Sequence, residues 1–164
     1  MCYCRMETRM SKRVMTRSAA DNAYLHKDFH GALSAAIAYL HERYGANAVR
    51  DYLRQFAAAY YAPLTDAINQ RGLTALREHL ARVYTIEEQE VAITGTDDEL
   101  WLDVPRCPAV AHMRELGYPI AELFYETSRT VYQTICDGTL FAVEMLAHDP
   151  DTGRARFHFF RRPA

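Results

Sequence analysis

The sequence has no hydrophobic run long enough to cross a membrane and no paired Cys-x-x-C motif. A membrane-spanning helix needs about 20 apolar residues, and zinc sites and disulfide frameworks are recognised by regular cysteine spacing. The four cysteines, Cys2, Cys4, Cys107 and Cys136, show no such spacing. We therefore expect a cytoplasmic protein with reduced cysteines and no membrane partner.

Motifs of the common nucleotide-binding and hydrolase folds are also missing. The sequence contains no Gly-rich phosphate loop, no Gly-x-Ser-x-Gly and no His-Glu-x-x-His. A net charge of −2 does not indicate a nucleic-acid partner. Lysine is scarce, with only Lys12 and Lys27, so nearly all positive charge is arginine. Arginine forks suit carboxylate ligands, although genome composition would give the same bias.

The first 18 residues have the composition of a basic arm. They carry five basic residues but no apolar region of the kind found in a secretory signal. We expect residues 1–18 to be disordered, and several methionines in this arm leave the native start site open. Residues 19–164 are sufficient for a single domain with its own core.

The hydrophobic pattern changes from a helical to a strand period near the middle of the chain. The expected helices of the first half cover 21–44, 64–70 and 74–84, and a further helix is expected to begin at Asn47. The second half is expected to contain strands at 91–94 and 100–104, helices at 108–116 and 119–136, and strands at 140–147 and 154–160. This order, N-terminal helices followed by ββ-αα-ββ, predicts an α+β fold with a mainly antiparallel sheet covered by helices.

Cys107 lies between an expected strand and an expected helix, with Pro108 in the first helical turn. The positive end of the helix dipole and the adjacent Arg106 favour thiolate over thiol. Cys107 is therefore a candidate nucleophile or metal ligand. The alternative is a small buried apolar residue, which is how many free cysteines behave.

The expected helix 119–136 carries a polar stripe beside its apolar face. Its members recur at alternating spacings of three and four and are Glu122, Tyr125, Arg129, Tyr132 and Cys136. A stripe of this chemistry suits a small polar ligand. The alternative is a half-exposed face with ordinary glutamate–arginine pairs.

His112 and Glu144 are the candidate general bases. Five residues of helix separate His112 from Cys107 by a rotation of about 140°, so the two can meet only if Cys107 lies outside the helix as a cap. His112 could instead face a ligand alone, or be an ordinary surface or core histidine. We expect Glu144 on a buried strand face, where its pKa would rise, or in an ion pair with Arg129 or Arg156.

His26 and His30 are four residues apart on an expected helix and could hold a divalent metal. A third ligand would have to come from elsewhere, such as Cys107 or Glu144. This spacing is common by chance, so we assign no metal or cofactor.

Several motifs together resemble a known family. They are Tyr39-Leu-His-Glu-Arg-Tyr-Gly45, Tyr52-Leu-Arg-Gln-Phe56, Arg106-Cys-Pro-Ala-Val-Ala-His-Met-Arg114, Ile135-Cys-Asp-Gly-Thr139 and Phe157-His-Phe-Phe-Arg161. The pattern is similar to the L-2-amino-thiazoline-4-carboxylic acid hydrolase-like family from about Tyr24 to Arg161. The resemblance implies hydrolytic opening of a small heterocycle that bears a carboxylate, giving an N-carbamoyl amino acid. Cys107 and His112 both belong to the Arg106–Arg114 motif that carries this resemblance.

We therefore expect a hydrolase acting on a carbon–nitrogen bond of a small cyclic amidine- or amide-like carboxylate. Cys107 would be the nucleophile or a metal ligand, and His112 or Glu144 the base. The expected substrate-binding residues are Arg106, Tyr125, Arg129, Tyr132 and Cys136, with one arginine holding the carboxylate.

Two other functions remain open. One is a small-molecule sensor without turnover, similar in layout to vinyl-reductase-type domains. The other is a homo-oligomer whose aromatic face, including Tyr60, Tyr61 and Trp101, forms an interface.

Overall fold

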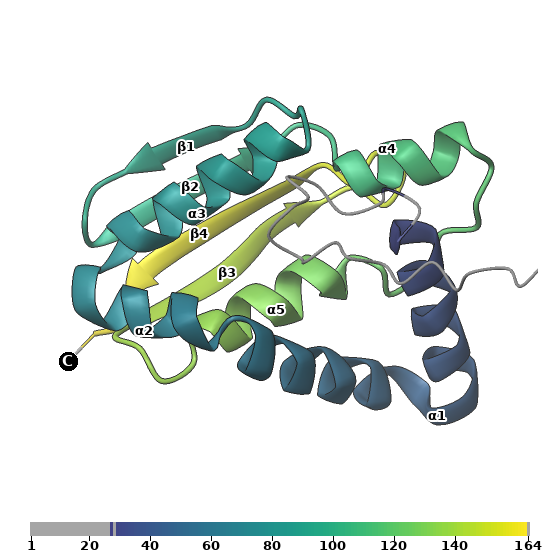
Figure 1. The fold of residues 1–164 in the computed structure, drawn as a ribbon, viewed down its shortest axis with the longest axis horizontal. Helices are drawn as coiled ribbons and strands as arrows, with labels where there is room; N and C mark the ends of the chain where they lie inside the picture. Colours follow the sequence, from purple (N-terminus) through teal and green to yellow (C-terminus); the bar gives the residue numbers. More distant parts are fainter. Residues whose placement is uncertain (1–26, 28, 164) are drawn as a thin grey trace, which may run out of the picture.

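The computed structural model describes residues 27 and 29–163. The helices are α1 (Phe29–Tyr60), α2 (Ala62–Arg71), α3 (Leu73–Ile86), α4 (Pro108–Glu115) and α5 (Glu126–Cys136). The strands are β1 (Ala92–Gly95), β2 (Glu99–Val104), β3 (Phe141–His148) and β4 (Ala155–Arg161) (Figure 1). The α+β prediction and the order of the elements are confirmed. The expected basic arm lies outside the described residues, and no helix within them is long and apolar enough to span a membrane.

Gly45 divides α1 into the two helices that the sequence predicted. Its φ of 81° and ψ of 173° are not helical, and the two halves of α1 run at a steep angle to each other (Figure 1). Glycine adopts positive φ without the steric cost that other residues have. The second half buries Val49, Leu53 and Ala57 and packs against α5.

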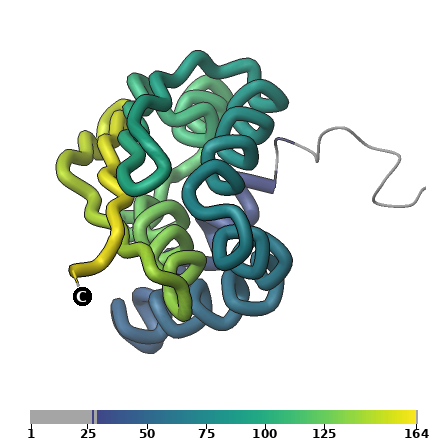
Figure 2. The backbone as a smooth tube through the Cα atoms, turned by 90° about the vertical axis from the view of Figure 1, so that its left-hand side faces the viewer, coloured from purple at the N-terminus to yellow at the C-terminus, as the bar shows by residue number. Residues whose placement is uncertain are grey.

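The four strands form one antiparallel sheet in the order β1-β2-β4-β3. Strands β3 and β4 lie on one side of the molecule and the helices on the other (Figure 2). Leu102 and its cross-strand partner Phe157 are buried on the helix side. On the opposite face, the rings of Trp101 and His158 stack with their centroids 3.9 Å apart. The sheet therefore has one packed face, in keeping with its alternating sequence.

The expected helix 119–136 is too long, because α5 begins only at Glu126. The preceding residues form turns that are held by Ser34 of α1. Its Oγ accepts a hydrogen bond from the amide of Ala121 at 2.8 Å and donates one to the carbonyl oxygen of Pro119 at 2.9 Å. These tertiary bonds satisfy the carbonyl of Pro119, which a helix starting there would pair internally, and the amide of Ala121, which such a helix would leave without a partner. The polar stripe predicted along this segment is therefore not a single helix face.

Candidate functional site

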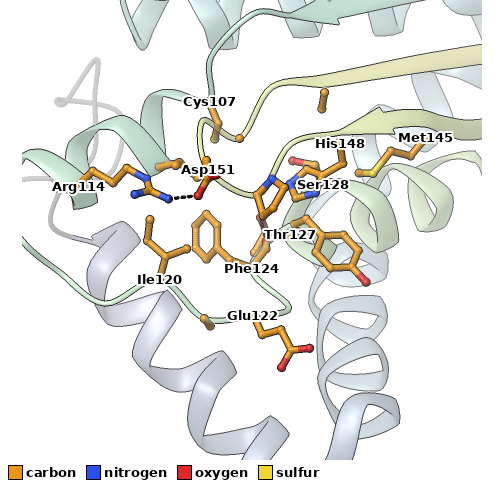
Figure 3. A pocket seen from close by; sticks show the side chains of 16 residues that line it. Cys107, Arg114, Ile120, Glu122, Phe124, Thr127, Ser128, Met145, His148 and Asp151 are labelled. Carbon is orange, nitrogen blue, oxygen red and sulfur yellow. Dashed lines mark hydrogen bonds and ion pairs between the residues drawn. The ribbon is translucent and has the colours of Figure 1, made fainter.

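Cys107 lines a pocket of about 300 Å³ between α4, the turns before α5, and the β3–β4 hairpin (Figure 3). The apolar part of the wall includes Ile120, Phe124 and Met145. The cavity lies at the lower end of the size range of small-molecule sites. At its edge, Nη2 of Arg114 lies 3.2 Å from Oδ1 of Asp151, so an ion pair links α4 to the hairpin (Figure 3).

Cys107 is the N-cap residue of α4 and is fixed by the tip of the hairpin. Its amide donates a hydrogen bond to the carbonyl oxygen of Thr152 at 3.1 Å. The adjacent Gly153 has a φ of +67°, and a Cβ there would lie only 2.4 Å from the Cβ of Cys107. The hairpin can thus approach Cys107 closely only because this position has no side chain.

The environment of Cys107 favours the neutral thiol. Burial raises the pKa of the Cys107 thiol, and the charge of Glu87 adds to this. The amides of Val110 and Ala109 at the start of α4 act in the opposite direction and lower the pKa, but they do not outweigh burial. The expected helix N-terminal effect is present, whereas the expected resting thiolate is wrong.

The histidine in this pocket is His148 at the end of β3, which the sequence reasoning missed. Burial lowers the pKa of its imidazole, and the neighbouring Asp149 raises it by a smaller amount, so the ring is neutral at pH 7. The ring centroid lies 5.1 Å from that of Tyr125.

A β-bulge turns His148 toward the helix side of the sheet. The predicted strand ended at Ala147, so His148 was not assigned to either face of the sheet. Strict alternation along β3 would put Met145 and His148 on opposite faces of the sheet. The register shifts between Met145 and Ala147, so that His148 pairs with Ala155 on the same face on which Met145 pairs with Phe157. A bulge of one residue exchanges the faces of all later side chains, and nothing in the alternation of the sequence marked its position.

Of the residues predicted to bind substrate, the structure brings only Tyr125 into the pocket with Cys107. Arg106 is exposed and does not line the pocket. Arg129 lies on α5 with Nη1 3.8 Å from Oε1 of Glu126. The prediction that Arg106 or Arg129 lies in one pocket with Cys107 is wrong, because Arg106 is exposed in the bend before α4 and Arg129 is paired with Glu126 on α5.

Tyr132 and Cys136 belong to the core rather than to the pocket. The ring of Tyr132 packs against Phe157 with centroids 5.0 Å apart, and burial raises its pKa to about 12. Cys136 is 1% exposed, and burial raises the pKa of its thiol to about 12 as well. Their spacing along α5 was identified correctly, but it turns both side chains toward the interior.

Neither predicted base lies in the pocket. Glu144 is exposed on the opposite face of the sheet, across from His158 of β4, so the expected buried carboxylate is wrong. The reason is the pleat of β3, which gives the helix side to Val143 and Met145. His112 is half-buried on α4 and does not line the pocket.

The suggested metal pair cannot be assembled from the described residues, because His26 lies outside them. Nε2 of His30 lies 3.6 Å from Oε1 of Glu87. Residues 27 and 29–163 contain no group of three His, Cys, Asp or Glu side chains placed to hold a metal ion.

The pocket therefore combines a neutral thiol, a neutral imidazole, the amides at the start of α4 and a mostly apolar wall. Such a set can bind a small planar molecule and attack it with sulfur, provided that the imidazole accepts the thiol proton. Comparisons with protein-family models and with curated proteins returned no match for this chain. The likeness to the thiazoline hydrolase-like family therefore stays a prediction.

Proposed function

We propose that this chain is a thiol-dependent hydrolase acting on a carbon–nitrogen bond of small cyclic amidine- or amide-like carboxylates. The observation that carries the proposal is the presence of the Cys107 thiol and the His148 imidazole in the wall of one pocket of about 300 Å³. The resemblance of the Cys107 motif to the thiazoline hydrolase-like family supports the substrate class.

In this proposal His148 takes the role that the sequence assigned to His112 or Glu144. Its neutral imidazole accepts the proton of Cys107 as Sγ bonds to the sp² carbon of the ring. The amides of Ala109 and Val110, which already face the sulfur, stabilise the thiolate as it forms. The imidazolium then returns the proton to the ring nitrogen as the carbon–nitrogen bond breaks. Water, deprotonated by His148, hydrolyses the resulting thioester-like bond and restores the thiol.

Arg114 replaces Arg106 and Arg129 as the proposed carboxylate ligand. Its guanidinium lies at the pocket edge, paired with the exposed Asp151. An exposed ion pair of this kind contributes only about 0–1 kcal/mol. A substrate carboxylate can therefore compete for the guanidinium at little cost and form a bidentate contact with it.

The test is a turnover screen on purified protein. Cyclic amidines and cyclic amides with a carboxylate are incubated with the protein, and mass spectrometry detects products that have gained one water. We expect Cys107→Ser and His148→Gln to abolish turnover, whereas Cys136→Ala retains it because that thiol lies in the core. Full turnover by Cys107→Ser would rule out the nucleophile.

A second candidate is a binding module without turnover, and the raised pKa of the Cys107 thiol favours it. Alkylation by iodoacetamide across pH, mapped to individual cysteines by peptide analysis, separates the two functions. A ligand that protects Cys107 and is recovered unchanged supports the binding module. A ligand that is consumed and leaves a transient adduct on Cys107 supports the hydrolase.

The cellular setting and assembly state belong to the same proposal. A cytoplasmic location fits because a catalytic thiol must stay reduced. Homo-oligomerisation is supported by the exposed aromatic side chains of α1, among them Tyr60 at 62% exposure. Light scattering coupled to gel filtration tests it, and a monomeric mass at high concentration would refute it.

A further inference from the structure

A second pocket, of about 420 Å³, lies between α2 and α3 near the end of α1 and shares no lining residue with the pocket of Cys107. Gly72 links the two helices with a φ of +65°, a conformation that glycine adopts easily, and α3 packs against α2. Helical spacings of three and four turn one face of each helix toward the pocket. These faces supply Ala67 and Arg71 of α2 and Ala75, Glu78, His79 and Arg82 of α3. The volume is within the range of small-molecule sites.

Aromatic rings form one wall of this second pocket. Tyr61, between α1 and α2, is half-buried, and its ring meets the imidazole of His79 edge to face with centroids 5.7 Å apart. The exposed ring of Tyr60 lies beside it, with centroids 4.9 Å apart. Aromatic side chains provide a large contact area for another ring. This wall therefore suits a ligand with an aromatic body.

Arg82 supplies a positive charge that no carboxylate balances. Its Nη2 lies 3.4 Å from Nδ1 of His79. A guanidinium only donates hydrogen bonds, so Nδ1 accepts and the imidazole carries its hydrogen on Nε2. Burial lowers the pKa of His79 and the charge of Arg82 lowers it further, so the ring is neutral at pH 7. Within residues 27 and 29–163, Arg82 forms an ion pair with no carboxylate.

The remaining charges of the second pocket cancel each other. Nη1 of Arg71 lies 2.8 Å from Oε2 of Glu78, so these two side chains form an ion pair across the start of α3. With His79 neutral, the lining residues keep one net positive charge, that of Arg82. A ligand with a single negative charge would balance it. A phosphate monoester, which carries about two negative charges at pH 7, would place an excess of negative charge beside Glu78.

We propose that the pocket between α2 and α3 binds a small aromatic monocarboxylate, with its ring against Tyr61 and its carboxylate on Arg82. The planar guanidinium can donate two parallel hydrogen bonds to a carboxylate, which fixes the orientation of the ligand. The site is separate from the pocket of Cys107, and it does not rest on the proposed hydrolase activity.

The experiment is calorimetric titration of the full chain with phenylacetate and with its uncharged analogue phenylacetamide. We expect saturable binding of phenylacetate and no measurable binding of phenylacetamide. Arg82→Gln should weaken phenylacetate binding about tenfold or more, because it removes the charged hydrogen-bond donor. Arg77→Gln is the matched control, since it makes the same change of charge on the same helix at a residue that does not line the pocket. It should bind phenylacetate as the unaltered chain does.

Two further measurements locate the bound ligand. The NMR resonances of the His79 ring, assigned by their loss in His79→Gln, should shift with phenylacetate but not with phenylacetamide. Arg114→Gln, which alters the pocket of Cys107, should leave these shifts unchanged.

Several results would overturn the proposed site. They are no saturable binding of phenylacetate, equal effects of Arg82→Gln and Arg77→Gln, or binding that Arg114→Gln weakens and Arg82→Gln does not. An oligomer that excludes phenylacetate because a second copy covers Tyr60 would overturn it as well. None of these results bears on turnover at Cys107, which Arg82→Gln should leave unchanged.

Discussion

Gly153→Ala tests how closely the β3–β4 hairpin is packed on Cys107. The new Cβ would lie 2.4 Å from Cβ of Cys107 and 2.9 Å from Cγ2 of Val110. Carbon atoms in contact prefer about 3.5–4.0 Å, so the hairpin must move by about 1 Å or more. Alanine at this position also keeps an unfavourable φ of +67°.

The two costs can be estimated separately. The left-handed backbone conformation costs a residue with a Cβ about 1–2 kcal/mol, and overpacking of a well-filled site costs about 1–3 kcal/mol. We expect Gly153→Ala to lower the free energy of unfolding by about 2–5 kcal/mol. Gly117→Ala is the matched control, because Gly117 has a φ of +69° but an added Cβ would meet nothing within 4 Å. It should show only the backbone cost.

Urea denaturation of the two variants measures the difference, and alkylation of Cys107 gives an independent readout. A displaced hairpin uncovers the thiol, so Cys107 should react faster in Gly153→Ala than in Gly117→Ala. Equal stabilities in the two variants would show that the hairpin does not press on Cys107, and the described geometry of the pocket would be wrong.

Three further predictions concern buried polar groups. Tyr132→Phe removes a hydroxyl that interacts with the phenol of Tyr84 and should cost about 1–3 kcal/mol in urea denaturation; no loss would mean that this interaction does not stabilise the fold. Burial lowers the pKa of His79, so the unfolded chain binds its proton more readily and stability should fall as the pH drops below about 6.5. His79→Gln should weaken this pH dependence of the urea midpoint, and an identical slope would contradict it. Glu126→Gln weakens the bond to Arg50 and should cost about 1–3 kcal/mol by the same assay, whereas a neutral effect would mean that burial of the carboxylate offsets its pairing.

Local sequence patterns were sufficient for most of the fold. Gly45 separated two helical stretches, and the alternation of Leu100 and Leu102 marked β2. Both features depend on near neighbours in the chain, because helix and strand periods differ and glycine tolerates positive φ. The start of α5 was not predicted, since it depends on hydrogen bonds that Ser34 makes from a distant helix.

The same local patterns identified only some of the residues of the candidate site. The motif around Cys107 identified a residue that lines the pocket, and Tyr125 was also selected. The spacing that selected Tyr125 extended to Tyr132 and Cys136, which the packing of α5 turns into the core. Helical spacing places side chains on a common face but does not indicate what that face will meet.

The sequence by itself determined the order of helices and strands, the antiparallel hairpins and the place of Cys107 at the start of α4, because each follows from local periodicity and turn chemistry. Only the tertiary structure decided the raised pKa of Cys107 and which histidine lines the same pocket. Burial outweighs the helix dipole at the thiol, and a bulge in β3 brings His148 to the pocket side, whereas the pleat before the bulge turns Glu144 to the opposite face. Both outcomes depend on contacts between segments far apart in the chain, which no local pattern encodes.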